Sequence, residues 1–188
     1  MLLLSCHPTT PCAALHSLQA TAEHTPEGGL RLRYLLNGDL AHILFPPPQA
    51  PVATDGLWEH TCFEAFIGVQ GKAAYREFNF SPSGQWAAYA FSSYRQRLAW
   101  MASHAPEVTF SLAPEGSKDG DGLQLDAFIA AADLPVNPKG KALELGLTAV
   151  IETTTGKKSY WALKHPPERP DFHQRAGFTA TLRQQAAK

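Results

Sequence analysis

The sequence lacks most of the signals that identify well-known classes of protein. Its 16 Lys and Arg residues are balanced by 17 Asp and Glu residues, so there is no basic excess to bind nucleic acid or an anionic membrane. Three cysteines, Cys6, Cys12 and Cys62, include no C-x-x-C pair and are too few for a disulfide framework. The sequence also has no G-x-S-x-G, no H-E-x-x-H and no phosphate-binding glycine loop. These absences weaken the case for an enzyme without excluding one.

Long hydrophobic runs are missing as well. The apolar residues that begin the chain, Met1 to Leu4, follow no basic segment, and Pro8 and Pro11 cut the run short. This pattern argues against a secretory signal. We therefore expect a cytoplasmic protein with no membrane partner; the alternative is an exported chain from which a signal has been removed.

The sequence has instead a repeated alternation with a period of two. Short segments of alternating apolar and polar residues, separated by many of its 15 prolines and 14 glycines, predict strands and turns. We predict one all-β domain over residues 1–188, a sandwich of two antiparallel sheets with about nine to eleven strands. The predicted strands are 14–25, 30–35, 41–45, 58–69, 74–81, 86–91, 107–112, 122–131, 142–153, 159–163 and 178–182, with a loop or short helix at 93–103 and a solvent loop at 114–121.

Two predicted hairpins in the middle of the chain define a candidate ligand site. A tight turn at Gln70-Gly71 places Glu64 opposite Glu77 and Cys62 opposite Asn79, so that polar residues face each other. A slip of one residue would mix the polar and aromatic faces, which favours this register.

A second turn, at 81–84, leads into the next strand. Centred on that turn, Trp86 falls opposite Asn79 and Ala88 opposite Glu77. The three strands then form a trough with a floor of small residues. The predicted core face carries Phe63, Ile67, Phe78, Phe80, Tyr89 and Phe91. The predicted walls and polar contacts of the trough are Trp58, His60, Glu64, Glu77, Asn79 and Trp86.

Three longer motifs carry a resemblance to a known family. They are L-W-E-H-T-C-F-E-A-F-I at residues 57–67, Y-R-E-F-N-F-S-P-S-G-Q-W at 75–86 and S-Y-W-A-L-K-H-P-P-E-R-P-D-F-H at 159–173. They resemble the bacterial DOMON-like proteins, whose superfamily includes the family 9 carbohydrate-binding modules and the DOMON haem or sugar domains. The resemblance implies a β-sandwich that holds a ligand on a concave sheet.

The resemblance also implies roles for individual residues. In family 9 modules two tryptophans clamp a sugar ring while carboxylate and amide groups bind its hydroxyls. Trp58 and Glu64 match the first tryptophan and the carboxylate of that pattern, and Trp161 is matched to the second tryptophan. Haem-binding members ligate iron with a methionine and a histidine. Because Met101 is the only methionine besides the initiator, no haem is expected.

Two carboxyl groups that face each other allow a second interpretation, that the protein is a hydrolase. Close like charges raise one pKa, as the acid and base pair of a glycosidase requires, and Glu64 and Glu77 would form that pair. Binding to a hydroxyl, or pairing with Arg95 or Arg169, is favoured because the sequence supplies no other catalytic element.

Histidines and edge strands leave two further alternatives open. A metal site would use His60, His165 and His173 with Asp171, but their spacing, interrupted by prolines, fits no compact ligand motif. An interaction domain with a vestigial trough would instead form a ligand-free homodimer through an edge strand.

The favoured hypothesis is a non-catalytic domain that binds a small polar ligand, a saccharide or a sugar-containing metabolite, without a cofactor and without nucleic acid. Trp58 and Trp161 are predicted to stack on the sugar ring, and Glu64 and Glu77 to bind its hydroxyls. The full set of predicted ligand-binding residues is Trp58, His60, Glu64, Glu77, Asn79, Trp86, Trp161 and Arg169.

Overall fold

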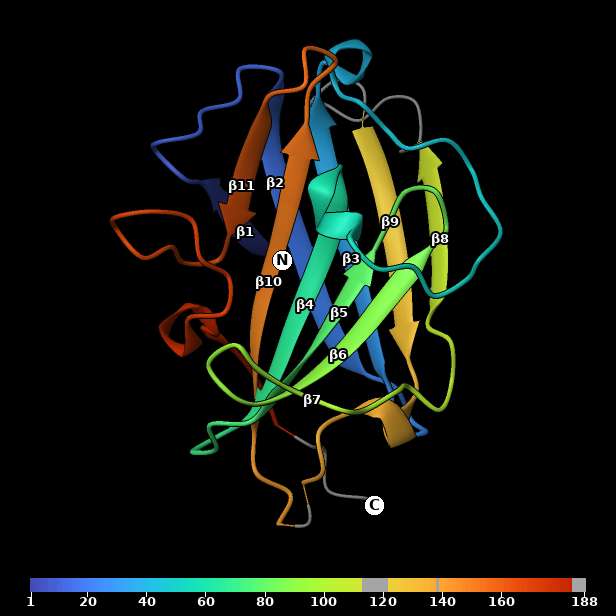
Figure 1. Cartoon of the computed structure of the whole chain (residues 1–188), viewed down its shortest axis with the longest axis vertical. Coiled ribbons are helices and arrows are strands. Elements are labelled where there is room, and N and C mark those ends of the chain that lie inside the picture. The colour runs from blue at the N-terminus through green and yellow to red at the C-terminus, as the bar shows by residue number, and fades with distance from the viewer. Residues whose placement is uncertain (113–121, 138, 184–188) are drawn as a thin grey trace.

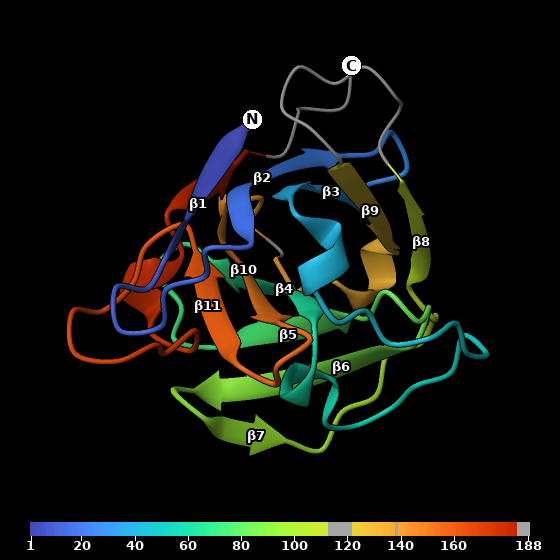
Figure 2. The ribbon, with the colours of Figure 1, turned by 90° about the horizontal axis from the view of Figure 1, so that it is seen from above.

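The computed structural model describes residues 1–112, 122–137 and 139–183, which form two antiparallel sheets packed face to face (Figures 1 and 2). Eleven of the twelve strands in this part of the chain follow one continuous path, and the twelfth pairs beside it, so the predicted β-sandwich is confirmed. Sheet A consists, in order, of β1 (Leu2–Cys6), β2 (Leu15–His24), β3 (Leu30–Gly38), β9 (Gly122–Ile129) and β8 (Glu107–Leu112). Sheet B consists of β7 (Gln96–Leu98), β6 (Trp86–Ser93), β5 (Tyr75–Phe80), β4 (Cys62–Val69), β10 (Leu143–Glu152), β11 (Lys158–Ala162) and again β1, with β12 (Ala180–Leu182) also paired to β10.

The helical elements are short 3-10 turns. None of the helices in the described residues is long and apolar enough to cross a membrane. The turns are η1 (Leu40–His42), η2 (Leu57–Glu59), η3 (Ala131–Asp133) and η4 (Arg175–Gly177).

β1 joins the two sheets and was not among the predicted strands. Leu4 pairs with Leu18 of β2, while Cys6 pairs with Trp161 of β11. The run of three leucines in β1 has no alternation, and a strand without alternation cannot be told from other apolar segments by its period.

The space between the sheets is filled by alternate residues of the central strands. Leu18 and Leu32 of sheet A and Phe63 and Ile67 of sheet B are fully buried there. Each side chain of this size contributes about 1.5–3 kcal/mol when it leaves water. Tyr34 also crosses the core, where its hydroxyl donates a hydrogen bond of 2.7 Å to the backbone carbonyl of Glu64.

The outer face of sheet B is covered by the connection between β11 and β12, residues 163–179, which we call the covering loop. β11 and β12 pair with successive halves of one edge of β10, so the loop between them passes over the sheet. Its Phe172 and Phe178 pack on Phe66 and Tyr75. A second hydrophobic cluster results, composed of Leu57, Cys62, Phe66, Tyr75, Ala87, Tyr89, Phe91 and Phe178, with Phe172 against it.

Both predicted registers in sheet B are wrong, with different consequences. Between β4 and β5 the connection is longer than a two-residue turn, and Glu64 pairs with Asn79 in place of Glu77. A shift of two residues keeps each side chain on its predicted face. Glu64 and Glu77 therefore share a face as diagonal neighbours.

The register between β5 and β6 differs by one residue, which moves side chains of β6 to the other face. Ser81 and Gln85 close the turn with a backbone hydrogen bond, and Gly84 takes a φ of +91°. Glu77 consequently pairs with Tyr89. Tyr89 and Phe91 lie on the outer face, whereas Trp86 and Ala88 lie on the core side, contrary to the prediction.

Two other segments differ from their predictions, and a third cannot be compared. The strand predicted at 41–45 is wrong, because η1 forms there and Ile43 makes a single bridge with Thr153. Residues 93–103, predicted as a loop or short helix, contain the strand β7. The solvent loop predicted at 114–121 lies outside the described residues.

Candidate functional site

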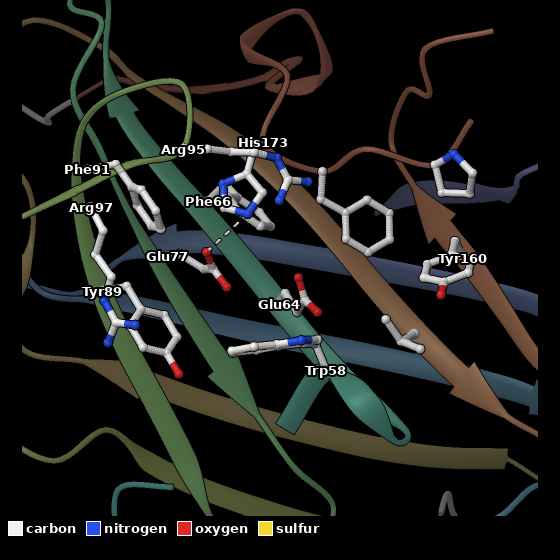
Figure 3. Close-up of a pocket in the computed structure, with 13 residues that line it drawn as sticks. Trp58, Glu64, Phe66, Glu77, Tyr89, Phe91, Arg95, Arg97, Tyr160 and His173 are labelled. Carbon is white, nitrogen blue, oxygen red and sulfur yellow. Dashed lines mark ion pairs between the residues drawn. The ribbon is translucent and has the colours of Figure 1, made fainter. Parts of the chain in front are cut away.

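A pocket of about 400 Å³ lies on the outer face of sheet B, between the sheet and the covering loop (Figure 3). Its volume falls in the range of small-molecule sites, and it combines aromatic walls with a few polar groups, as such sites do. The residues that line it are Trp58, Glu64, Phe66, Glu77, Tyr89, Phe91, Arg95, Arg97, Val150, Tyr160, Pro170, Phe172 and His173.

The floor of the pocket carries two carboxyl groups. Glu64 of β4 and Glu77 of β5 are 3% and 5% exposed, and both side chains point into the cavity (Figure 3). The amide of Asn79 donates a hydrogen bond of 2.9 Å to Glu77. In the described part of the chain, the hydroxyl of Thr148 is the side-chain partner of Glu64. Thr148 lies directly opposite it on β10.

Burial makes both carboxyl groups weak acids. The pKa of Glu64 is well above its ordinary value, first because the group is removed from water and second because Glu77 is close; the Thr148 hydroxyl acts in the opposite sense. Burial also raises the pKa of Glu77 to about 7, although Asn79 and two arginines favour its charged form. Burial therefore favours the protonated form of both carboxyl groups, and Glu77 titrates close to neutral pH.

Trp58 forms one wall and is the most exposed large aromatic side chain of the pocket. It belongs to η2, which follows Gly56 at a φ of +78°, and 40% of its surface is exposed. The ring stands edge-on to Tyr89, with 5.9 Å between centroids. Tyr89 is held in turn by a short hydrogen bond from its hydroxyl to Asp55. The indole face is thus fixed in place yet accessible to a ligand.

A hydrogen-bonded network ties the covering loop to the β6–β7 connection. The carboxylate of Asp171 accepts hydrogen bonds from Tyr94 at 2.7 Å and from Arg95 at 3.0 Å. Burial opposes ionisation of Asp171, but these bonds bring its pKa below the ordinary value. His173 lies 2.8 Å from the hydroxyl of Tyr75. Burial and the charge of Arg95 lower the pKa of His173 to about 4, so its ring is neutral at neutral pH.

The structure brings together some of the predicted site residues. Trp58, Glu64 and Glu77 line the pocket. Asn79 is fully buried behind Glu77 and acts through its hydrogen bond to that carboxyl group. His60 lies in a neighbouring hollow that shares Trp58, with its ring bonded to Glu152 at 2.7 Å.

Three other predicted residues lie elsewhere. Trp161 points into the core, is 6% exposed, and donates a hydrogen bond of 3.0 Å to Ser159. Trp86 faces the core side because of the register of β6. Arg169 is exposed on the covering loop, outside the residues that line the pocket. Besides Trp58, the aromatic residues that line the pocket are Phe66, Tyr89, Phe91, Tyr160 and Phe172, and the predicted second tryptophan is not among them.

Two glycines within strands are sequence features that indicate a close approach of the covering loop. A Cβ at Gly146 would lie 2.8 Å from the ring of Phe178, and one at Gly68 would overlap the guanidinium group of Arg175. Glycine inside a strand marks a close approach of another segment. Both positions lie on the outer face, so they indicate that this face is covered.

The alternative sites find little support in the described residues. His60, His165 and His173 are held by different partners, Glu152, the carbonyl of Ser5 and Tyr75. Within the described ranges, no three His, Cys, Asp or Glu side chains are grouped to hold a metal ion. Met101 is 85% exposed and away from the pocket.

Comparison with known proteins identifies the fold. No protein-family model and no curated protein matches the sequence. A candidate carbohydrate-binding protein from Bacteroides uniformis ATCC 8492 is 21% identical with a TM-score of 0.64, over 89% of this chain and 78% of that one. A family 9 carbohydrate-binding module from Caldicellulosiruptor kristjanssonii, in complex with glucose, is 8% identical with a TM-score of 0.59, over 100% and 86% of the two chains. A family 9 module from Caldicellulosiruptor kristjanssonii in complex with cellotriose is 9% identical with a TM-score of 0.51, over 94% of this chain and 80% of that one. At these identities the likeness establishes a fold like that of the family 9 modules.

Proposed function

We propose that the pocket is a non-catalytic binding site for a saccharide or a sugar-containing metabolite, and that the chain is a bacterial DOMON-like protein. The observation that carries the proposal is the placement of an accessible indole beside two buried carboxyl groups around one cavity. A sugar ring has an apolar face that packs on a flat aromatic surface and hydroxyls that need donors and acceptors at its edge. Trp58 supplies the surface; Glu64 and Glu77 supply the polar partners.

Two further observations favour this function. Burial raises the pKa of both carboxyl groups; such a group accepts a hydrogen bond from a hydroxyl when it is ionised and can donate one when it is protonated. The solved structures with the same fold include modules in complex with glucose and cellotriose.

The rival function, hydrolysis by Glu64 and Glu77, fits the arrangement less well. In glycosidases the two carboxyl groups flank the bond that is cleaved. Here both rise from adjacent strands of one sheet and approach a ligand from the same side. Binding without turnover is the simpler consequence of that geometry.

Isothermal titration with a panel of mono- and oligosaccharides tests the proposal. We expect saturable binding of at least one sugar and a loss of about tenfold or more in Trp58→Ala, because the stacking surface is removed. Trp100→Ala is the matched control, since Trp100 packs on Phe78 and Arg76 outside the pocket. The proposal fails if no sugar binds, or if Trp58→Ala binds as tightly as the wild type. Release of reducing sugar that is lost in Glu64→Gln would favour the hydrolase.

A further inference from the structure

Of the two carboxyl groups of the floor, Glu64 is the one without a positively charged partner among the described residues, because the nearby arginines act on Glu77. His173 Nε2 lies 3.7 Å from Glu77 Oε2, but its ring is neutral at neutral pH. Within the described ranges, Glu64 makes no ion pair, and the hydroxyl of Thr148 is its side-chain hydrogen-bond partner. Buried carboxylates in proteins are normally paired with a cation or with several donors. Glu64 is 3% exposed and faces an open cavity, so a ligand can supply the cationic partner that these residues do not.

The positive charges of the pocket are gathered at one end. Arg95 is engaged by Asp171, and the guanidinium of Arg97 lies over the ring of Tyr89, 4.1 Å from its centroid. Both arginines favour ionisation of Glu77, whereas neither is among the groups that act on Glu64. Figure 3 shows Glu64 between Glu77 and Trp58, on the side away from Arg97. The end of the pocket at Glu64 is thus acidic and aromatic, and none of the described residues brings a cation to it.

We propose that the preferred ligand is an amino sugar, a saccharide with a free primary amine, whose ammonium group binds at Glu64 beside the ring of Trp58. This inference rests on the proposed function and narrows its ligand class. An ammonium group has three donors and no acceptor, which suits two neighbouring carboxyl groups with unused oxygens. An aromatic ring face adds a cation–π attraction. A neutral hydroxyl at the same place would gain only one ordinary hydrogen bond.

Binding of an ammonium group has a consequence that a neutral sugar lacks. A cation beside Glu64 favours its charged form, so the protein releases protons when the amino sugar binds. Other ionisable and polar groups near the floor interact with Glu64 or Glu77 and so affect how many protons are released. They are Glu77 itself, Cys62, Tyr34, Thr148, Tyr89, Asp55, Arg95, Arg97 and His173. Of these, Glu77 is the one whose pKa of about 7 makes it the second source of protons at neutral pH.

Titration of the unmodified protein with matched sugars is the first test. D-glucosamine is compared with glucose and N-acetylglucosamine, and D-galactosamine with galactose and N-acetylgalactosamine, at pH 7 in phosphate and in Tris. For at least one set we expect the amine to bind about tenfold more tightly than both neutral sugars. The binding enthalpy of the amine should also differ between the buffers by more than that of the neutral sugars, because a cation favours ionisation of the carboxyl groups more strongly than a hydroxyl does.

The outcomes separate the two proposals. Neutral sugars that bind as tightly as their amines, or an amine that binds without proton release, overturn the inference and leave the proposed function intact. Failure of every sugar to bind overturns both.

An isosteric substitution locates the ammonium group. Glu64→Gln should abolish the preference for the amine and reduce proton release while neutral sugars still bind. Glu23→Gln, an exposed position on β2, is the matched control and should change nothing. A preference that survives in a folded Glu64→Gln protein contradicts the assignment to Glu64. If the variant does not fold, the buffer comparison on the wild type still decides the question.

Discussion

Strands β3 and β4 pack against each other across the core, yet only one of them has a face in water. In β3 the buried Leu30 and Leu32 alternate with the exposed Arg31 and Arg33. In β4 all eight residues are buried. Both strands give alternate side chains to the shared core, so the difference lies in their outer faces. Sheet A leaves its outer face in solvent, whereas sheet B is covered by residues 163–179.

The comparison shows how burial changes the pKa of polar side chains that point outward from a sheet. Arg33 of sheet A pairs with Asp126 at 2.7 Å in contact with water, and exposed pairs of this kind contribute little. Glu64 and Glu77 also point outward, from sheet B, but they are buried, and burial raises their pKa values. Polar groups held under such a penalty, around an open cavity, are candidates for function.

The largest expected contrast is between two tryptophans of sheet B. Trp161→Ala should lower the free energy of unfolding by about 3–5 kcal/mol, because the side chain is buried in the core. Trp58→Ala should lower it by less than about 1 kcal/mol, since its side chain is already partly in water. Urea denaturation measures both. Equal losses in the two variants would contradict the division between core face and pocket face.

Glu77 of sheet B should contribute a pH dependence of stability that the outer face of sheet A lacks. The pKa of Glu77 rises on folding from its ordinary 4.5 to about 7, so the folded state holds the proton more tightly. Its stabilising contribution is complete below pH 4.5 and is lost as the pH rises through 7. Since one pKa unit corresponds to about 1.4 kcal/mol, the loss is about 3 kcal/mol.

His173, with its lowered pKa, gains stability over the same pH range and partly masks this loss. The Glu77 contribution is therefore measured as the difference between wild type and Glu77→Gln in urea denaturation between about pH 4.5 and 8. Asp126→Asn, the matched change on sheet A, should leave the slope unaltered. An identical slope in wild type and Glu77→Gln would show that Glu77 is not a buried weak acid.

The covering loop should depend on the space left by Gly146. Gly146→Ala should destabilise the fold by about 1–3 kcal/mol and weaken saccharide binding, because the added methyl displaces Phe178. Phe178→Leu in the same chain should relieve part of the overlap, so the two changes together should cost less than their sum. Additive free energies in this double-mutant cycle would mean that the glycine does not position the loop.

The smallest effect is expected on the outer face of sheet A. Asp126→Asn breaks the exposed pair with Arg33 and should change the free energy of unfolding by less than about 1 kcal/mol. A larger loss would mean that this face is more constrained than its exposure indicates.

Much of the fold follows from alternation in the sequence. The residues of β3, β8 and β10 alternate clearly, and their strands were predicted close to their observed bounds. The pairing registers of the strands were harder to predict, because the composition of a connection does not specify how many residues its turn contains. The tight turn predicted at Gln70-Gly71 is longer in the structure, and Ser81 pairs with Gln85 around Gly84.

Trp58, Glu64 and Glu77 line the pocket as the prediction placed them, whereas the predicted floor of small residues in β6 lies on the core side. Glu64 and Glu77 remained on the expected face because their register shifted by two residues. Tyr89 and Phe91 changed face because theirs shifted by one. His173 and Phe172 reach the pocket through the covering loop, and no period in the sequence specifies where an irregular segment folds back. Trp161 was assigned to the site from a resemblance, although its place in β11 directs it to the core.

The most direct measurement is a crystal structure of the protein with a saccharide that titration has shown to bind. The account predicts density for the sugar on the outer face of sheet B, with its ring against Trp58 and its polar groups at Glu64 and Glu77. A sugar bound on the outer face of sheet A, or in the neighbouring hollow at His60, would contradict it.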